Sequence, residues 1–412
     1  MQQNIDFPKI SQHKSTDRLF FCNFAGKLFV IRTLYCYEAG RESLLWHECH
    51  IAALSDITSI THFLISILVM SKKRIAFIVN PISGTCNKDV IPTLIGKHID
   101  ATIYDTALMF TEYAGHASEI ASRCAAKGYD IVVAVGGDGT VNEVARALAE
   151  TPTALGIVPC GSGNGLARHL MLPMNFGGAL DIINMGEIHS LDYGIINSHP
   201  FFCTCGMGFD AFISKKFAEA GKRGPLTYIE NVLKEGLSYK PETYELTLDN
   251  NEAEPYKAFL ISVANASQYG NDAYIAPQAS MSDGLLDVVI IQPFDILEAP
   301  QVGIDLLNKT LNKSSKIKCY QAKNIVIKRR ESGTIHFDGD PIEESAELHI
   351  SLRSKGIRMV VNPLADKKRR KPNIVQNAFS MLFNEMNAVR EEVSNPSKHV
   401  KAINNFIQNK LS

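Results

Sequence analysis

The chain lacks the features that define several large classes of protein. Its formal net charge is −1, so it has no overall attraction for nucleic acid or for an anionic surface. The apolar run at residues 61–70 is too short to span a bilayer, and no small-residue cleavage site completes a signal peptide. The nine cysteines are scattered without the spacing of a metal site, which indicates reduced thiols in a cytosolic protein. The remaining composition, 45% hydrophobic and 21% charged, is typical of a soluble globular protein.

The most informative segment is residues 131–147, where an apolar run ends in a glycine-rich turn and a helical pattern follows. A continuous apolar run bounded by glycine is typical of a strand buried in a parallel sheet. Glycines let the backbone come close to a ligand, and the amides at the start of the next helix attract phosphate. The acid and hydroxyl among these glycines favour a nucleotide phosphate site over a turn without a ligand. The predicted phosphate-binding residues of this turn are Gly136, Gly137, Gly139 and Thr140.

Two further strand-and-turn units accompany this segment. The strand expected at residues 75–79 runs into a turn in which Asn80 and Gly84 are predicted nucleotide-binding residues. The strand expected at 154–158 runs into a third turn, whose predicted nucleotide-binding residues are Gly161, Ser162, Gly163 and Asn164. From Lys72 to about Ile196, strands expected at residues 75–79, 101–105, 131–135 and 154–158 alternate with helices expected at 115–127, 142–149 and 178–184. This alternation predicts an α/β domain with a doubly wound parallel sheet. All three turns follow strand carboxyl ends, so we expect them to converge on one ligand.

The turn sequence Gly-Gly-Asp-Gly-Thr, followed by Val-Asn-Glu-Val, resembles the nucleotide-binding core of the diacylglycerol kinase and sphingosine kinase family of lipid kinases. NAD kinases share the glycine core, but the three turns in this order and spacing are more similar to the lipid kinases. The resemblance covers roughly residues 71–363. It implies an ATP-dependent kinase that phosphorylates a hydroxyl of diacylglycerol or a sphingoid base. A NAD kinase and a catalytically inactive nucleotide-binding regulator are the alternatives.

The second half of the chain has a different pattern. After Pro200, short extended segments separated by turn residues predict a mainly antiparallel β-sandwich, interrupted by one helix at residues 226–237. The expected strands lie at residues 244–249, 258–263, 286–292, 323–329, 333–337, 347–352 and 357–363. The family has such a second domain, with the active site in the cleft between the two. A start at Met70, followed by basic residues and the first strand, would make the preceding residues an upstream extension from a non-native start; an accessory segment is the alternative. The predicted segments are 1–69 (extension), 70–198 (nucleotide-binding domain), 199–363 (lipid-binding domain) and 364–412 (tail).

Phosphoryl transfer needs cradled phosphates, cations that neutralise charge and a base for the acceptor hydroxyl. Asp340 in His-Phe-Asp-Gly-Asp-Pro resembles the last acid of the family's Asp-Gly-Glu element, a candidate base, with the shorter Asp in place of Glu. A plain Asp-Gly-Asp hairpin turn is the alternative, and Asp138 is the competing candidate for the base. Lys222 and Arg223 lie in a Gly-Lys-Arg-Gly loop and are the expected phosphate-binding cations.

Magnesium is expected with the nucleotide, because it prefers oxygen ligands and bridges phosphates. The resemblance implies that Asp138 and Asp192 belong to a three-acid network around the metal, whose third position is Gly165 in this chain. Asp283 matches the acid of a second, structural metal site in some bacterial relatives, although a hairpin turn explains it nearly as well.

Two features point to the lipid side of the reaction. Asp210 resembles the acid that contacts the lipid head group in the family, with a structural salt bridge as the alternative. The cations Lys367–Lys371 precede apolar residues at helical spacing, which favours peripheral association with an anionic membrane, or else a solvated linker with a docked helix. The expected location is therefore cytoplasmic and peripherally membrane-associated. Nucleic-acid binding is not expected, because no aromatic-bearing basic surface accompanies the cluster.

Overall fold

The computed structural model describes residues 72–83, 88–220, 239–294, 298–309 and 315–365, together with five strands within residues 18–54. The chain divides into two compact units, Met1–Lys72 and Lys73–Ser412. The first unit contains one antiparallel sheet of order β1-β2-β5 and one hairpin of β3 and β4. Its strands are β1 (Arg18–Phe24), β2 (Lys27–Thr33), β3 (Cys36–Glu38), β4 (Arg41–Ser43) and β5 (Ala53–Leu54).

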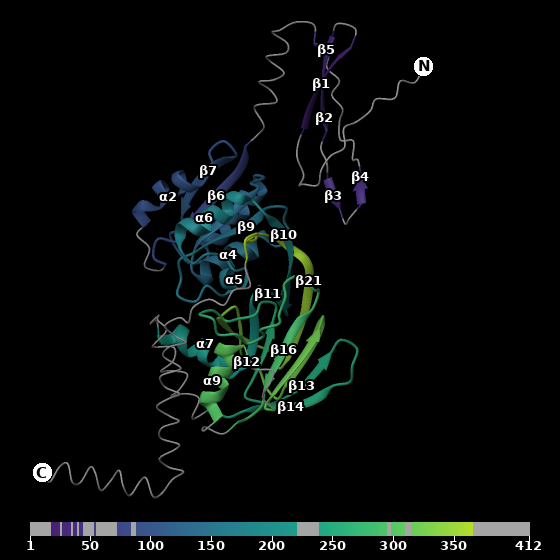
Figure 1. Ribbon diagram of the computed structural model, residues 1–412. Coiled ribbons are helices and arrows are strands. Elements are labelled where there is room, and N and C mark those ends of the chain that lie inside the picture. The colour runs from purple at the N-terminus through teal and green to yellow at the C-terminus, as the bar shows by residue number, and fades with distance from the viewer. Residues whose placement is uncertain are drawn as a thin grey trace, which may run out of the picture. The chain divides into compact units, whose positions relative to one another are not determined.

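The second unit begins with an α/β lobe built on four parallel strands in the order β9-β8-β6-β7 (Figure 1). Every residue of β8 and β9 is buried, as the continuous apolar runs predict. Helix α3 packs with α4, and α2 packs with α6. The strands are β6 (Lys73–Val79), β7 (Tyr104–Phe110), β8 (Ile131–Gly136) and β9 (Ala154–Pro159). The helices are η1 (Lys88–Val90), α2 (Ile91–His98), α3 (His116–Ala126), α4 (Asp138–Leu148), α5 (Gly165–His169) and α6 (Phe176–Met185).

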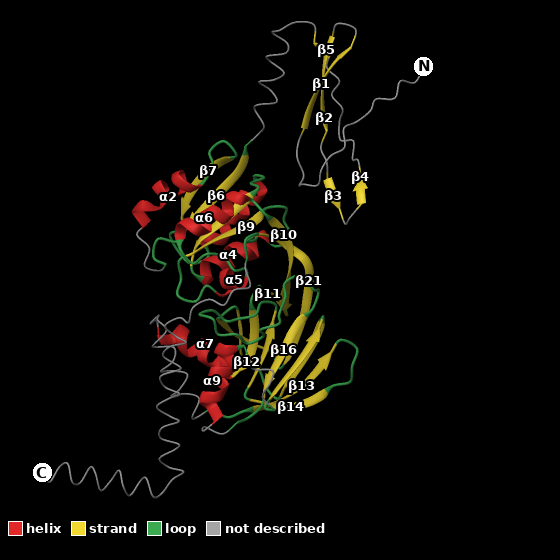
Figure 2. Ribbon diagram, viewed as in Figure 1, coloured by secondary structure: helices red, strands yellow, loops and turns green. Residues whose placement is uncertain are grey.

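A β lobe follows, in which strands dominate and helices α7 and α9 lie beside one sheet (Figure 2). That sheet is antiparallel, with the order β17-β16-β15-β12-β19-β20. The facing strands β14, β13, β18 and β21 belong to the same sheet as the parallel strands of the α/β lobe. The 14-residue strand β21 makes this connection, since it pairs antiparallel with β18 and β10 and then parallel with β9.

The core of the β lobe lies between these two layers and is made of branched and aromatic side chains from both. The first elements of the lobe are β10 (Ile188–Ile196), β11 (His199–Phe201), β12 (Thr204–Gly208), α7 (Phe209–Ala220), β13 (Glu242–Leu248), β14 (Glu254–Ala258) and β15 (Leu260–Ala264). The remaining elements are β16 (Leu286–Ile291), α9 (Ala299–Asn308), β17 (Ile317–Ala322), β18 (Asn324–Arg329), β19 (Gly333–Phe337), β20 (Asp340–Glu344) and β21 (Glu347–Val360).

The predicted fold class, an α/β domain followed by a mainly antiparallel β-sandwich, is confirmed. The predicted helix at 226–237 lies outside the described residues. The segment boundaries proposed from the sequence stay predictions. None of the helices in the described part of the chain has the length and apolar character needed to cross a bilayer.

Candidate active site

The glycine-rich turn after β8 leads directly into α4, which begins at Asp138. The residue before the helix, Gly137, has no side chain that caps the first amides of α4. A Cβ atom at Gly136 would lie 2.6 Å from the Thr140 side chain, so glycine is required there by packing. A Cβ atom at Gly139 would meet nothing within 4 Å, so the described residues give no packing reason for glycine at that position. The start of α4 therefore presents amides beside open space.

The turn after β6 contacts this turn through its asparagine. Asn80 Nδ2 donates to Thr140 Oγ1 at 3.1 Å, and Asn80 Oδ1 accepts from the backbone N–H of Ile82 at 3.1 Å. The Asn80 backbone N–H donates to the carbonyl of Val135 at the end of β8. The side chain of Asn80 thus joins the first and second turns. Gly84 lies outside the described residues.

The third turn is held against the second by Asp138. The backbone N–H groups of Asn164 and Gly165 donate to the two carboxylate oxygens of Asp138, each at 2.8 Å. The backbones also touch, because a Cβ atom at Gly161 would lie 2.6 Å from the Cα atom of Gly137. The three turns predicted to converge therefore lie together at the carboxyl ends of their strands.

The rest of the third turn is fixed by both lobes. Arg168 Nε donates to the Gly163 carbonyl at 2.9 Å, and its Nη1 forms an ion pair with Asp272 of the β lobe at 2.9 Å. Asn164 adopts a left-handed backbone (φ 54°) and closes the turn through its side chain, which contacts the Gly161 N–H and carbonyl. Ser162 is exposed at the tip of the turn.

Gly165 occupies the position at which the family pattern has an acid. A Cβ atom there would lie 3.1 Å from the backbone oxygen of Tyr269. A side chain at this position would therefore require the β-lobe backbone to move by a few tenths of an ångström, which disfavours an acid there.

The β19–β20 hairpin brings two acids from the β lobe. Asp338 and Gly339 both have positive φ values, 53° and 91°, and Phe337 pairs with Asp340 across them. This is a two-residue turn of type I′, for which Asp-Gly is a favoured sequence. The hairpin interpretation of the Asp-Gly-Asp motif therefore describes its backbone, and leaves open what its side chains do.

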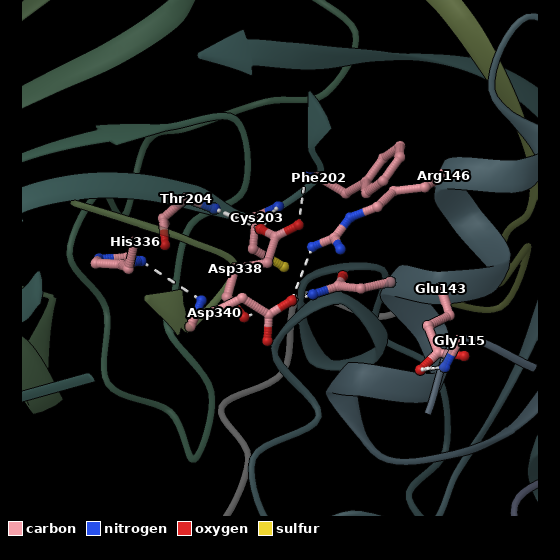
Figure 3. Close-up of polar contacts among 11 residues, drawn as sticks. Gly115, Glu143, Arg146, Phe202, Cys203, Thr204, His336, Asp338 and Asp340 are labelled. Carbon is pink, nitrogen blue, oxygen red and sulfur yellow. Dashed lines mark hydrogen bonds and ion pairs between the residues drawn. The ribbon is translucent and has the colours of Figure 1, made fainter. Parts of the chain in front are cut away.

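The two acids of this hairpin point in different directions (Figure 3). Asp338 turns toward residues 202–204, whose three backbone N–H groups donate to its carboxylate at 2.7 to 3.0 Å. Burial raises the pKa of Asp338 to about 6, although these hydrogen bonds and the nearby Arg146 oppose the shift. Asp340 turns toward α4, where its Oδ2 accepts from Arg146 Nη2 at 2.9 Å. The Asp340 side chain is 52% exposed.

A third acid of the β lobe lies at the start of α7. Asp210 Oδ1 accepts from the Ala211 backbone N–H, and its Oδ2 lies 3.2 Å from the Tyr269 hydroxyl and 3.1 Å from His336 Nε2. The His336 and Asp210 side chains are only 3% and 10% exposed. The Gly339 N–H donates weakly to His336 Nδ1, which leaves the proton on Nε2 for a hydrogen bond to Asp210. Asp210 is therefore a nearly buried carboxylate with fixed partners.

These groups surround one cavity of about 220 Å³, which we call the interlobe cavity. Its volume lies below the range typical of pockets for drug-sized ligands. The α/β lobe contributes the start of α4 and of α5, and the β lobe contributes the hairpin, α7 and the 269 loop. The lining residues are Asp138, Val141, Asn142, Leu166, Cys203, Thr204, Asp210, Ile213, Ser214, Tyr269, His336, Asp338 and Gly339. Asp340 is not among them.

The predicted metal-binding acids are not gathered in one place. Asp192 is buried, and its carboxylate accepts from the Gly284 and Lys355 backbone N–H groups and from the Ser354 hydroxyl. Asp283 is exposed and accepts from the Leu285 N–H in its own turn. The described residues include no cluster of three or more His, Cys, Asp or Glu side chains able to hold a metal ion. The metal roles of these acids stay predictions.

Other predicted site residues lie outside the described residues, namely Lys222, Arg223 and Lys367–Lys371. Conversely, several cavity residues were not predicted. Asn142 follows Asp138 by one helical turn, and Asp338 stands two residues before Asp340, so spacing and motif could have indicated both. Tyr269 comes from a loop with no recognisable signal in the sequence.

Comparison with known proteins finds relatives with the same two-domain organisation. A family model described as diacylglycerol kinase catalytic domain matches residues 74–196, and one described as YegS C-terminal NAD kinase beta sandwich-like domain matches residues 203–365. A diacylglycerol kinase from Staphylococcus saprophyticus is 27% identical over 274 residues, covering 65% of this chain and 89% of that protein. A diacylglycerol kinase from Staphylococcus epidermidis is 28% identical over 274 residues, with 65% and 86% covered.

A solved structure of a diacylglycerol kinase from Bacillus anthracis shares the fold, with a TM-score of 0.57 and 23% identity, over 71% of this chain and 98% of that chain. The two family models follow one another along the chain in the order of the two lobes. The chain therefore carries two consecutive domains that match the diacylglycerol kinase family, as its glycine-turn motifs predict.

Proposed function

We propose that this protein is an ATP-dependent lipid kinase, which transfers a phosphoryl group to a hydroxyl of diacylglycerol or of a sphingoid base. The proposal is supported by similarity to relatives that are named diacylglycerol kinase. The observation that carries it is the interlobe cavity, where Asp138, which directly follows the glycine-rich turn of one lobe, faces Asp210 and Asp338 of the other. A transferred phosphoryl group needs such a junction between a phosphate cradle and a proton acceptor.

The nucleotide side is assigned to the start of α4. The first amides of a helix carry partial positive charge and bind phosphate. No capping side chain of Gly137 competes for them, and Gly139 borders open space in the described structure. The contact between Asn80 and Thr140 aligns the first turn with this site. We infer that the terminal phosphates of ATP lie against Gly137–Thr140.

We assign to Asp138 the role of the general base, which removes the proton of the acceptor hydroxyl. A general base must lie within hydrogen-bond reach of the proton it removes. Asp138 lines the interlobe cavity, whereas Asp340 is half-exposed beside Arg146 and does not. The two amides that hold Asp138 fix the direction of its carboxylate. The geometry thus favours Asp138 over Asp340 as the base.

The acceptor side is assigned to the β lobe. Val141, Leu166 and Ile213 provide apolar cavity wall, while Asp210 provides a fixed acceptor for a head-group hydroxyl or amine. Because Tyr269 and His336 already hold this carboxylate, a ligand meets it with little reorganisation.

The residues of this site would hold Mg²⁺ only together with bound ATP, whose phosphates supply part of its ligands. Mg²⁺ is usually bound through one or two carboxylates, water and substrate phosphates. The described residues offer no three-acid cluster, so we infer that phosphate oxygens and water supply most of its ligands. Among the acids that line the cavity, Asp138 would supply the carboxylate ligand of the ion. When bound, the ion would neutralise charge on the phosphates.

A catalytically inactive nucleotide-binding regulator remains the second candidate. It is favoured by two departures from the family pattern, Gly165 in place of an acid and Asp340 in place of a glutamate. The Asp340 side chain is also half-exposed and does not line the cavity. In that case the fold would bind ATP without transferring phosphate.

One assay separates these functions. The full chain is incubated with ATP and Mg²⁺ and with dioctanoylglycerol, sphingosine or NAD, and phosphorylated product is measured for each. Product from either lipid supports the proposal, and product from NAD alone would identify a NAD kinase. ATP binding without any product would favour the regulator. Asp138→Ala serves as the control for contaminating kinases, because it should yield no product.

Association with membranes is part of the proposal. A cluster of five cations attracts an anionic bilayer surface, where lipid substrate is found. Sedimentation with vesicles of phosphatidylcholine, with and without phosphatidylserine, tests it. We expect binding only to the anionic vesicles, and loss of binding when Lys367–Lys371 are replaced by Gln. Equal binding to both kinds of vesicle would contradict the electrostatic account.

A further inference from the structure

One face of α4 runs along the hairpin of the β lobe. Asp138, Asn142 and Arg146 are four residues apart and therefore lie on one side of the helix. Asp138 lines the interlobe cavity, Asn142 Nδ2 contacts the Asp338 carbonyl at 3.5 Å, and Arg146 contacts Asp340. The helix that carries the proposed base thus also carries the groups that meet the hairpin.

Arg146 makes the strongest of these contacts. Its Nη2 lies 2.9 Å from Asp340 Oδ2, and its guanidinium carbon lies 4.6 Å from the ring centre of Phe337. Figure 3 shows Arg146 and Asp340 pointing toward one another between the two lobes. Among the described residues, no acceptor meets the buried Nε of Arg146. The side chain is therefore directed by the carboxylate and the ring, both of which belong to the hairpin.

We propose that Arg146 is a positioning residue, which acts on the reaction through Asp340 by fixing the 338–340 hairpin against α4. This inference rests on the proposed function. Asp338 and Gly339 line the cavity, so the position of the hairpin sets the distance between the cavity wall and Asp138. A displacement of about 1 Å in such a wall can lower a rate by about 100-fold.

The exposure of the pair separates this role from a merely structural one. Arg146 and Asp340 are 26% and 52% exposed, and ion pairs this exposed contribute little to folding. Removal of the arginine should therefore leave the unfolding temperature nearly unchanged. An effect on turnover without an effect on stability would point to positioning.

The geometry also predicts how well lysine can replace arginine. A lysine ammonium can reach a carboxylate as a point charge, but it lacks the flat guanidinium that stacks on the Phe337 ring. Arg146→Lys should restore part of the activity that Arg146→Ala loses.

The test compares kcat and the KM for ATP in Arg146→Ala, Arg146→Lys, Asp340→Ala and the Arg146→Ala/Asp340→Ala double variant. Lys328→Ala is the control for loss of an ion pair away from the cavity, since Lys328 pairs with Glu347 at 3.3 Å on the other sheet of the β lobe and is the more exposed of the two cations. We expect Arg146→Ala to lower kcat by about 10- to 100-fold with an unchanged KM. The double variant should be no slower than Asp340→Ala, and Lys328→Ala should match the wild type.

Three results would overturn the inference. The first is wild-type kcat in Arg146→Ala. The second is a double variant whose loss is the product of the two single losses, because the two residues would then act independently. The third is a wild-type protein that phosphorylates no lipid, which would remove the proposed function itself; in the first two cases that function stands.

Discussion

Both lobes bring carboxylates to the interlobe cavity, and Asp138 of the α/β lobe and Asp338 of the β lobe are held there in different ways. Asp138 of the α/β lobe accepts two amides from the neighbouring glycine turn of the same lobe. Asp338 of the β lobe accepts three amides from residues 202–204, and burial raises its pKa to about 6. One lobe therefore builds its part of the site from turns at neighbouring strand ends. The other assembles it from segments more than a hundred residues apart.

This difference has a consequence for function. The carboxylate of Asp138 is fixed at the start of a helix, where partial positive charge stabilises an anion. The carboxylate of Asp338 is shielded from water and faces the backbone of residues 202–204. Asp138 is thus the acid suited to meet a substrate, and Asp338 is the acid suited to hold the hairpin in place.

The largest effect is expected from removal of the Asp138 carboxylate. Asp138→Ala should lower the rate of phosphoryl transfer by about 1,000-fold or more, since general-base catalysis alone contributes about 10²- to 10⁴-fold. Product formation from dioctanoylglycerol measures this loss. Asp249→Ala is the control, because Asp249 also accepts two backbone amides, each at 2.9 Å, but lies in the β13–β18 region. Comparable rates in the two variants would contradict the assignment of Asp138.

The contact between the glycine turns offers a second test. Gly161→Ala would place a Cβ atom 2.6 Å from the Cα atom of Gly137 and 2.9 Å from Asn164 Oδ1. Such overpacking should lower the free energy of unfolding by about 1 to 3 kcal/mol, as measured by urea denaturation. Gly96→Ala in α2 is the control, since a Cβ atom there meets nothing within 4 Å and alanine favours the helix. A fully stable Gly161→Ala variant would show that the two turns can separate.

A substitution at Gly139 should have the opposite pattern to one at Gly161, because it should affect ATP affinity and not stability. A Cβ atom at Gly139 meets nothing within 4 Å, and alanine favours the first turn of α4, so Gly139→Ala should not destabilise the protein. If the space beside it holds phosphate, ATP affinity should fall by about tenfold, which corresponds to about 1.4 kcal/mol. Isothermal titration with a non-hydrolysable ATP analogue measures this change. Unaltered affinity would place the nucleotide elsewhere.

The contrast between the lobes also explains which helices and strands could be predicted from the sequence. The buried strands β6, β8 and β9 were predicted within two residues at each end, because both of their faces are apolar. Strand β7 begins at Tyr104, not at the predicted residue 101, because an edge strand with exposed side chains lacks that pattern. Helix α4 begins at Asp138, four residues before its predicted start. The segment at residues 138–141, which contains Gly139, has low helix propensity, so the sequence pattern did not indicate a helix there. In the structure, the amides of the third turn hold Asp138 in place at the start of the helix.

The β lobe was predicted less well, for reasons that lie in long-range contacts. One strand was expected at residues 258–263, but two strands, β14 and β15, meet at Phe259 and belong to different sheets. Two strands were expected within β21, because Lys355 and Gly356 interrupt its apolar pattern. Lys355 adopts a left-handed backbone, and its N–H donates to the Asp192 carboxylate. This long-range contact keeps β21 continuous across the interruption. No pattern local to the sequence contains this information.

The candidate site follows the same division. The turns around Asn80, Asp138 and Asn164 could be predicted, because each is a short motif at the end of a strand. The contacts of Asp338 with residues 202–204, and those of Asp210 with Tyr269 and His336, join distant segments. Sequence motifs therefore find the nucleotide side of this site more readily than the acceptor side.

The smallest predicted effect concerns an acid of the β lobe that lies outside the cavity. Burial raises the pKa of Asp287 to about 6, and the neighbouring Asp283 adds to the shift. Its Oδ1 accepts from Gln321 at 3.3 Å, while no donor among the described residues meets its buried Oδ2. Unlike Asp338, it therefore has few hydrogen bonds that offset the burial of its charge.

The sign of the pH dependence follows from this raised pKa. Between about pH 4 and pH 6 the folded protein binds the Asp287 proton more strongly than the unfolded chain does, so its contribution to stability is present at low pH and is lost as the pH rises through 6. Asp287→Asn removes the charge, and at pH 7.5 should raise the free energy of unfolding by about 1 kcal/mol after allowance for solvent exposure. Urea denaturation at pH 7.5 and 4.5 measures this. The gain should shrink to about a third at the lower pH, because the folded carboxyl is then protonated while the unfolded one, with a pKa of 3.8, is still mostly ionised. An equal gain at both pH values would mean that the asparagine side chain stabilises the fold by packing or hydrogen bonding. The burial of the Asp287 charge would then be offset by hydrogen bonds, as it is for Asp338.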